Sequence, residues 1–183
     1  MREIGSLELD ENEATDVRVE GARQAGESFE RARLVGVELV RCDLSGCNFA
    51  EVAWLRMTLV DCRLTGVELS QSSLRDVAFR SCKLDDANLR MAKLRNVTFD
   101  DCVLAGAELV ASECERVAFR DCDLTRVDFT KVRCKEVDLR GARLGGVRGI
   151  GALRGATISP DQLIGLAPAL ADAVGLRVLV DDE

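Results

Sequence analysis

Cysteine is the residue type in this sequence with the widest chemical repertoire. The chain has eight cysteines and no histidine. Five of the cysteines lie twenty residues apart, at Cys42, Cys62, Cys82, Cys102 and Cys122. Thiols that are brought together could ligate zinc, form disulfides or take part in redox chemistry. Which of these applies depends on how the intervening segments place the side chains.

General acid–base chemistry has few candidates. The absence of histidine removes the commonest general base and the commonest metal ligand. The carboxylate pairs Asp85–Asp86 and Asp100–Asp101 are adjacent in sequence, and adjacent residues of an extended chain point apart. The sequence has no glycine-rich phosphate loop and no triad or Cys–His pair. It therefore predicts a protein that is not an enzyme, with no catalytic residue, no metal site and no cofactor.

The spacing of the cysteines belongs to a pattern with a period of five residues. Every fifth residue from Phe29 to Leu144 is Leu or Phe, except Trp54, Cys114 and Cys134. The residue two positions earlier is Ala, Val, Cys or Ser in 22 of these 24 units. A helix has a period of 3.6 and a strand a period of 2. A period of five indicates a chain that turns a corner every five residues, with two inward positions per side.

A second period of twenty residues groups four such units into one square coil. Val77, Val97 and Val117 repeat at this spacing, as do the five cysteines. Identical residues then stack on the coil above, and cysteine fills an inward position as a small buried hydrophobe. A linear stack of thiols does not provide the tetrahedral geometry of zinc, and parallel side chains are unfavourable for disulfides. This structural interpretation of the cysteines is preferred over a metal or redox site.

Three five-residue units show the relation to a known family most clearly. CDLSG at 42–46, ANLRM at 87–91 and VDLRG at 137–141 resemble the A(D/N)Lxx motif of the pentapeptide-repeat family. The resemblance covers roughly residues 29–147. It implies an all-β solenoid, the right-handed quadrilateral β-helix. Six coils at about 4.8 Å each would form a rod roughly 29 Å long.

The chain is expected to divide into three segments. Residues 1–28 would form an irregular N-terminal coil or cap, because Val17 and Val19 continue the inward pattern there. Residues 29–154 would form the β-helix. Residues 155–183 would form a C-terminal helical cap and dimerisation tail, since a bare solenoid end exposes core and unpaired backbone.

The tail carries helix signals. SPDQ at 159–162 has the pattern of a capping box with proline at the first helical position. Pro168 is expected to break or kink the segment into two short helices, and Gly175 to end it. Residues 176–180 are expected to form a short strand. The apolar stripe expected in a dimer interface comprises Leu163, Leu166, Leu170 and Val174.

Charge is unevenly distributed along the chain. The formal net charge is −7, and the acidic excess lies in residues 1–31 and 155–183. One side of the expected coil presents an acidic stripe, proposed to bind a partner, of Glu68, Glu108 and Asp128 with Asn48 and Asn88 between or beside them. The next side is net basic, with Arg33, Arg56, Arg75, Lys93, Arg95, Arg116, Arg133 and Lys135.

A small apolar patch is expected at outward positions near the N-terminal end. It consists of Val35, Val40, Leu55 and Val60. Contiguous exposed apolar residues usually mark a contact surface. Either residues 1–20 fold over the patch, or a partner protein binds there.

The family resemblance suggests a partner. Members that bind bacterial type II topoisomerases resemble duplex DNA in diameter and negative charge, occupy the DNA-binding surface of gyrase and confer quinolone resistance. This chain is most similar to the mycobacterial fluoroquinolone-resistance members in its length, its uninterrupted coil and its tail DQLIGLAPALADAVGL. That tail resembles the helix through which those members form homodimers.

Two functions are therefore open. One is a homodimeric DNA mimic that binds DNA gyrase; the other is a scaffold or interaction rod for an unrelated protein partner. Direct nucleic-acid binding is not expected, given the acidic total charge and the few aromatic residues. No apolar run is long enough for a membrane span, and no signal-peptide pattern follows Met1, so a cytoplasmic location without membrane association is expected.

Overall fold

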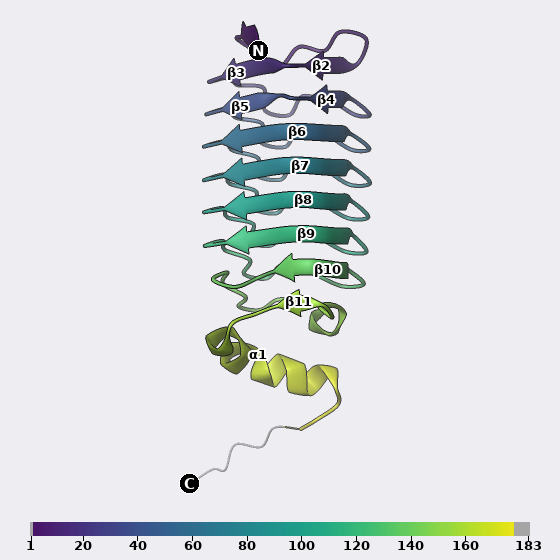
Figure 1. The fold of residues 1–183 in the computed structure, drawn as a ribbon, viewed down its shortest axis with the longest axis vertical. Helices are drawn as coiled ribbons and strands as arrows, with labels where there is room; N and C mark the ends of the chain where they lie inside the picture. The colour runs from purple at the N-terminus through teal and green to yellow at the C-terminus, as the bar shows by residue number, and fades with distance from the viewer. Residues whose placement is uncertain (1, 178–183) are drawn as a thin grey trace.

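The computed structural model describes residues 2–177 as a column of stacked coils closed at one end by a helix (Figure 1). The parallel sheet follows the order β1-β3-β5-β6-β7-β8-β9-β10-β11, and β4 pairs with β2 and β6. The elements are β1 (Arg2–Ile4), β2 (Glu13–Thr15), β3 (Val17–Glu20), β4 (Arg33–Val35), β5 (Glu38–Val40), β6 (Ala53–Val60), β7 (Ser73–Arg80), β8 (Lys93–Asp100), β9 (Glu113–Arg120), β10 (Arg133–Asp138), the 3₁₀ helix η1 (Ile150–Ala152), β11 (Ala156–Thr157) and α1 (Pro160–Ala173).

Strand register confirms the twenty-residue coil and the solenoid fold. Val77 pairs with Val97, and Val97 with Val117, so each residue lies beside the residue one coil later. Isolated parallel bridges continue the same register on the other sides, for example from Asn48 to Glu68. The backbone hydrogen bonds therefore run along the rod axis, between successive coils.

The core is built from the two inward positions of each five-residue unit. The leucines and phenylalanines at the unit centres are almost fully buried, and so are the five stacked cysteines. The rings of Phe79, Phe99 and Phe119 stack with centroids 4.7 and 4.9 Å apart. Trp54 occupies one centre, and its Nε1–H has no hydrogen-bond partner in the described part of the chain. Packing of matched side chains between coils thus holds the interior together.

Each corner of the coil requires a left-handed backbone conformation. Every fifth residue from Asp16 to Gly146 has a positive φ, between 50° at Ser81 and 82° at Gly141. Such angles disfavour β-branched residues above all, and none of these positions holds Val, Ile or Thr. The eight-residue strands β6–β9 each contain one such corner and therefore extend over two sides of the coil.

The N-terminal segment continues the parallel sheet before the first regular coil. β1 pairs with β3, and β3 with β5. The buried Gln24 side chain accepts a hydrogen bond from the Leu7 N–H at 2.6 Å and donates to the Leu7 carbonyl at 3.1 Å. This side chain closes the core where the regular repeat has no preceding coil.

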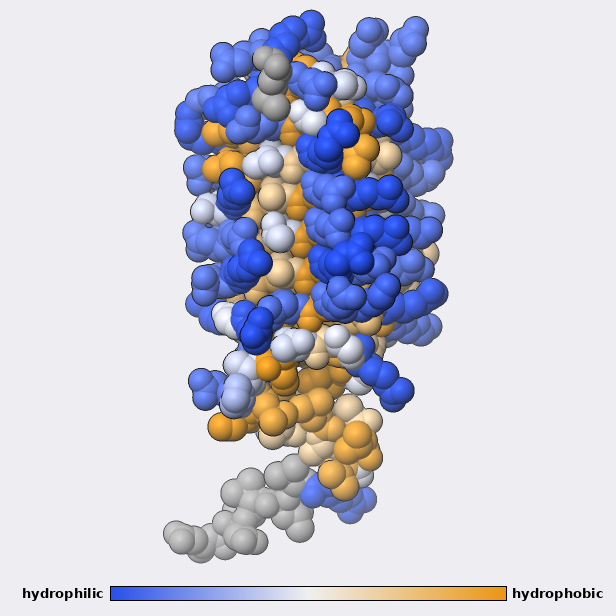
Figure 2. Space-filling model, viewed as in Figure 1, coloured by the Kyte–Doolittle hydropathy of each residue, from blue (hydrophilic) through white to orange (hydrophobic). Residues whose placement is uncertain are grey.

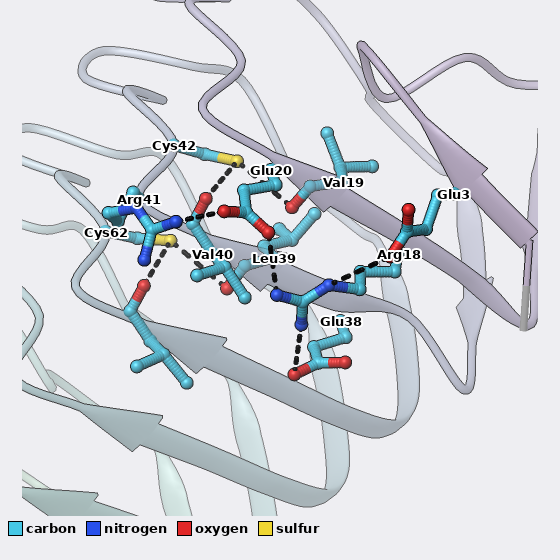
Figure 3. Close-up of polar contacts among 11 residues, drawn as sticks. Glu3, Arg18, Val19, Glu20, Glu38, Leu39, Val40, Arg41, Cys42 and Cys62 are labelled. Atoms are coloured by element: carbon cyan, nitrogen blue, oxygen red, sulfur yellow. Dashed lines mark hydrogen bonds and ion pairs between the residues drawn. The ribbon is translucent and has the colours of Figure 1, made fainter.

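Ion pairs tie the first coils together (Figure 3). Arg18 of β3 contacts Glu38 of β5 and Glu20 at 2.7 Å each, and Glu3 of β1 at 3.8 Å. Hydrogen bonds from Arg18 to Glu38 and Glu20 raise the pKa of its guanidinium. Arg41 adds a second contact to Glu20. Three successive strands of the N-terminal end are thus linked through one arginine.

The C-terminal cap begins as predicted. The Ser159 hydroxyl accepts a hydrogen bond from the Gln162 N–H at 3.3 Å, and Gln162 Oε1 accepts one from the Ser159 N–H at 2.7 Å, which completes the capping box. The Gln162 amide also donates to the carbonyls of Leu139 and Ala142 at 2.6 and 2.7 Å. Helix α1 is thereby anchored to the last coil of the rod.

The C-terminal segment differs from the expectation at Pro168. Pro168 does not divide the segment, because α1 runs without interruption from Pro160 to Ala173. Leu166 and Leu170, on either side of the proline, both pack against the core, so tertiary contact outweighs the loss of one backbone donor. The helix ends before Gly175, at φ 76°, as predicted. Leu176 and Arg177 form no strand, and the rest of the strand expected at 176–180 lies outside the described residues.

Helix α1 is too short and insufficiently apolar to cross a membrane, and no other helix of residues 2–177 meets that requirement either.

Candidate protein-binding surfaces

The expected acidic stripe forms one continuous column on the rod. Parallel bridges connect Asn48, Glu68, Asn88, Glu108 and Asp128 in that order, and the column ends at Arg148. The side chains follow each other at the spacing of the coils, about 4.8 Å. The structure thus brings the predicted residues together, with two amides among the three carboxylates.

The carboxylates of this column are already bound by neighbouring donors. Glu68 accepts hydrogen bonds from the Asn88 amide and the Ser70 N–H, both at 2.8 Å. Glu108 accepts one from Arg90 at 3.1 Å, and Asp128 forms an ion pair with Arg148 at 3.1 Å. The column is therefore a mixed polar surface and not a continuous negative band.

Asp128 shows how the surroundings fix the charge of this column. Partial burial disfavours its carboxylate, but hydrogen bonds from Thr130 and the nearby Arg148 and Arg90 hold its pKa below the usual value. The Thr130 N–H donates to Oδ1 at 2.9 Å. Asp128 consequently stays ionised at neutral pH, with its charge balanced by Arg148.

The four residues of the expected apolar patch are adjacent but less exposed than the sequence suggests. Val35 pairs with Leu55, and Val40 with Val60. Val35 and Val40 are buried, whereas Leu55 and Val60 are half-buried. β2 places Thr15 beside Val35, and β3 places Glu20 beside Val40. The N-terminal strands thus adjoin this patch, while its role in binding a partner stays a prediction.

Helix α1 divides the expected interface residues between two environments. Leu166 is buried against the end of the rod, and Leu170 is half-buried there. Leu163 and Val174 are 51% and 72% exposed. Figure 2 shows hydrophobic residues gathered at this end of the molecule, below the hydrophilic body of the rod. Only the exposed residues are available to a partner in the isolated chain.

The structure adds residues to this surface that the sequence pattern did not identify. Ile164 is 74% exposed and Leu176 is 65% exposed. Ile164 lies next to the predicted stripe and would be assigned to the solvent side by periodicity alone. A cavity of about 250 Å³ adjoins the helix and is lined by Ile150, Leu153, Ala156, Ile158, Leu166 and Leu170, with Gly151 and Arg154. Exposed apolar side chains and an apolar cavity therefore lie at one end.

The cysteine column has structural contacts throughout. Cys62 Sγ donates to the carbonyls of Val60 and Leu39 at 3.3 and 3.4 Å. Cys114 occupies a unit centre outside this column, and burial raises the pKa of its thiol to about 12, which disfavours the reactive thiolate there. The described residues hold no group of three or more side chains arranged to bind a metal ion. The five thiols of the column are all buried in the core.

These features define a parallel β-solenoid with a mixed polar column along one side and exposed apolar residues at its C-terminal end. Residues 32–109 and 75–148 match the family described as the pentapeptide repeat region, so the chain belongs to the pentapeptide-repeat family. A comparison with curated proteins found no match.

Solved structures share the fold. The chain is similar to two trypsin-treated variants of QnrB1, a plasmid-mediated fluoroquinolone resistance protein, at 22% sequence identity in both cases. For one, the TM-score is 0.56, with 90% of this chain and 91% of that chain covered. For the other, the TM-score is 0.54, with 91% of each chain covered. The solenoid architecture is thus common to these proteins over nearly their whole length.

Proposed function

We propose that this protein is a non-catalytic binding rod that acts as a homodimer joined at α1 and whose partner is a bacterial type II topoisomerase such as DNA gyrase. The observation that carries the dimer is the exposed apolar surface of Leu163, Ile164, Val174 and Leu176 at the end of the rod. Large apolar side chains clustered on a surface mark sites of protein contact.

The topoisomerase partner rests on family membership and on the fold shared with QnrB1. A dimer joined at α1 would double the length of the rod. It would also bring Asp161 and Asp172 of the two α1 helices towards its centre, while the three acids at 181–183 lie outside the described residues. Negative charge there would favour a surface that normally binds DNA, because electrostatics dominate such binding.

The distribution of charge on the body of the rod favours a second candidate, an interaction rod for a different protein. The acidic column alternates with Asn48 and Asn88 and ends at Arg148. Ion pairs between coils, such as Asp128–Arg148, neutralise much of the remaining charge. A partner selected by shape and local pairs, and not by a uniform negative potential, fits this surface.

The test uses one substitution on α1 and a matched control on the rod. Ile164→Asp adds a negative charge near the helix N-terminus, where acidic residues are tolerated, so the cap should remain folded. Met91→Asp makes a similar change at a site that is 52% exposed on the body of the rod. Light scattering should show a dimer for the wild type and Met91→Asp, and a monomer for Ile164→Asp.

Gyrase supercoiling assays then test the partner. The wild type and Met91→Asp should inhibit supercoiling, whereas Ile164→Asp should inhibit at least about tenfold more weakly. A wild-type protein that is monomeric would disprove the dimer. A dimer without effect on supercoiling at high excess would disprove the topoisomerase partner and leave the second candidate.

A further inference from the structure

A groove lies on the outer surface of the rod across the first halves of β7, β8 and β9. Its cavity measures about 370 Å³. The polar side chains that line it are Ser73, Arg75, Lys93, Arg95, Glu113 and Glu115. This groove is separate from α1 and from the acidic column, and no step of the proposed function uses it.

The two carboxylates of the groove are bound by cations of neighbouring positions. Glu113 forms an ion pair with Arg133 at 3.1 Å. Glu115 contacts Arg95 at 2.9 Å and Lys135 at 3.0 Å. The hydrogen bond from Lys135, together with nearby arginines, holds the pKa of Glu115 below its usual value. Both carboxylates are thus paired with cations.

Two cations of the groove have no such partner. Within residues 2–177, no carboxylate oxygen lies within 4.0 Å of the charged groups of Arg75 or Lys93. Both side chains are exposed, and both lie at the groove. Lys93 lies opposite Glu113 in the strand register, but Glu113 is paired with Arg133. The groove therefore retains two cations without an ion pair next to the Ser73 hydroxyl.

The strand register concentrates this charge. Arg75 of β7 and Arg95 of β8 are paired residues of adjacent strands. Like charges at directly opposite positions destabilise a sheet. On its other side Arg95 lies opposite Glu115, which it contacts at 2.9 Å, so the like-charge contact is confined to Arg75 and Arg95. A local conflict of this kind is expected where a site serves a ligand.

We propose that this groove binds a small molecule that carries a phosphate monoester. Guanidinium groups donate paired hydrogen bonds to phosphate oxygens, and a serine hydroxyl supplies a further donor. The two cations without an ion pair match a phosphate that carries about −1.5 to −2 charges at neutral pH. The cavity also falls in the range of small-molecule sites, about 300–1,000 Å³, so it accommodates an organic group beyond the phosphate.

The experiment is calorimetric titration with inorganic phosphate and with phenyl phosphate at constant ionic strength. Both probes should bind saturably. Arg75→Gln and Lys93→Gln should each weaken binding by about tenfold or more, because each removes a charged hydrogen-bond donor. Lys83→Gln is the control, since it removes one charge from an exposed lysine that does not line the groove and has no ion pair in the described chain.

Thermal unfolding would verify that all three variants remain folded. Absence of saturable binding by either probe would overturn the proposal, and so would an equal loss of affinity in Lys83→Gln. Binding of inorganic phosphate without phenyl phosphate would refute the organic ligand. Tighter binding of a phosphoserine peptide than of phenyl phosphate would refute the small molecule in favour of a protein ligand.

Discussion

The Gln162 side chain donates hydrogen bonds to carbonyls at the end of the solenoid, where no further coil follows. One coil earlier, the carbonyl of Cys122 accepts a hydrogen bond from the Arg143 N–H at 2.9 Å. The equivalent carbonyl of Ala142 has no next coil, and the Gln162 side-chain amide donates to it instead, at 2.7 Å. The same amide donates to the Leu139 carbonyl, and Gln162 Oε1 accepts from the Ser159 N–H. The side chain therefore makes hydrogen bonds with three backbone groups at once, and the Leu139 carbonyl also accepts one from the Ala142 N–H at 3.1 Å.

Replacing Gln162 by alanine should destabilise the capped end by about 2 kcal/mol. Each of the three hydrogen bonds contributes about 1 kcal/mol net, and the sum is reduced because the half-buried site admits some water. Gln162→Glu separates the two roles of the side chain. Glutamate preserves the acceptor of the capping box, but an ionised carboxylate cannot donate to the two carbonyls. Its loss at neutral pH should be at least as large. The loss should shrink as the pH falls towards about 4, because the site disfavours the charged carboxylate and the protonated carboxyl group regains one donor.

Hydrogen exchange at the amides of α1 and of the last coil is the suitable assay, because the ends of a solenoid open independently of its centre. Gln71→Ala, an exposed glutamine on the body of the rod, serves as the control and should leave this protection unchanged. If Gln162→Glu at neutral pH matched the wild type, the donated hydrogen bonds would not stabilise the cap, and the reasoning would be refuted.

Other positions test the corners, the core and the charges of the rod. Gln71 has a φ of 56°, so Gln71→Gly should raise the free energy of unfolding by up to about 1 kcal/mol and Gln71→Val should lower it by about 1–2 kcal/mol, both measured by chemical denaturation. Trp54→Phe should cost less than about 1 kcal/mol in the same experiment despite the smaller ring, because it removes a buried N–H without a partner; a loss above about 3 kcal/mol would contradict this. A hydrogen bond from Arg140 holds the pKa of Asp138 at about 2, below the usual 3.8. This pair should stabilise the fold fully above about pH 4 and lose its effect as the pH falls towards 2. Since both side chains are exposed by a third or more, its contribution to the free energy of unfolding should be only a few tenths of a kcal/mol. Asp138→Asn should remove that part of the pH dependence, and an unchanged acid profile would argue against the pair.

The period of five made most of the fold predictable. Leu or Phe at each unit centre, with a small residue two positions earlier, determines which side chains point inward, and the twenty-residue spacing determines the register. The capping box at Ser159 was equally predictable from the sequence, because it depends on hydrogen bonds between residues close together in the chain. These features repeat or act over short distances, so one sequence is sufficient to find them.

The features that escaped prediction depend on tertiary contact. Pro168 lies inside an unbroken helix because Leu166 and Leu170 both pack on the rod, which helix propensity alone does not reveal. Val35 is buried although its position in the repeat points outward. The left-handed corners are marked in the sequence by the absence of Val, Ile and Thr at every fifth residue from Asp16 to Gly146. This absence can be interpreted only once the positive φ angles at these positions are known.

The regular succession of corners gives the rod a constant spacing along its axis. From Asp16 to Gly146 no residue is inserted into the five-residue pattern of positive φ angles. Any two sites on one side are therefore separated by a whole number of coils, in steps of about 4.8 Å. Duplication of twenty residues would lengthen the molecule by one step and leave the chemistry of every side and both ends intact. The distance between the N-terminal end and α1 can thus change in whole coils while the residues of both ends stay the same.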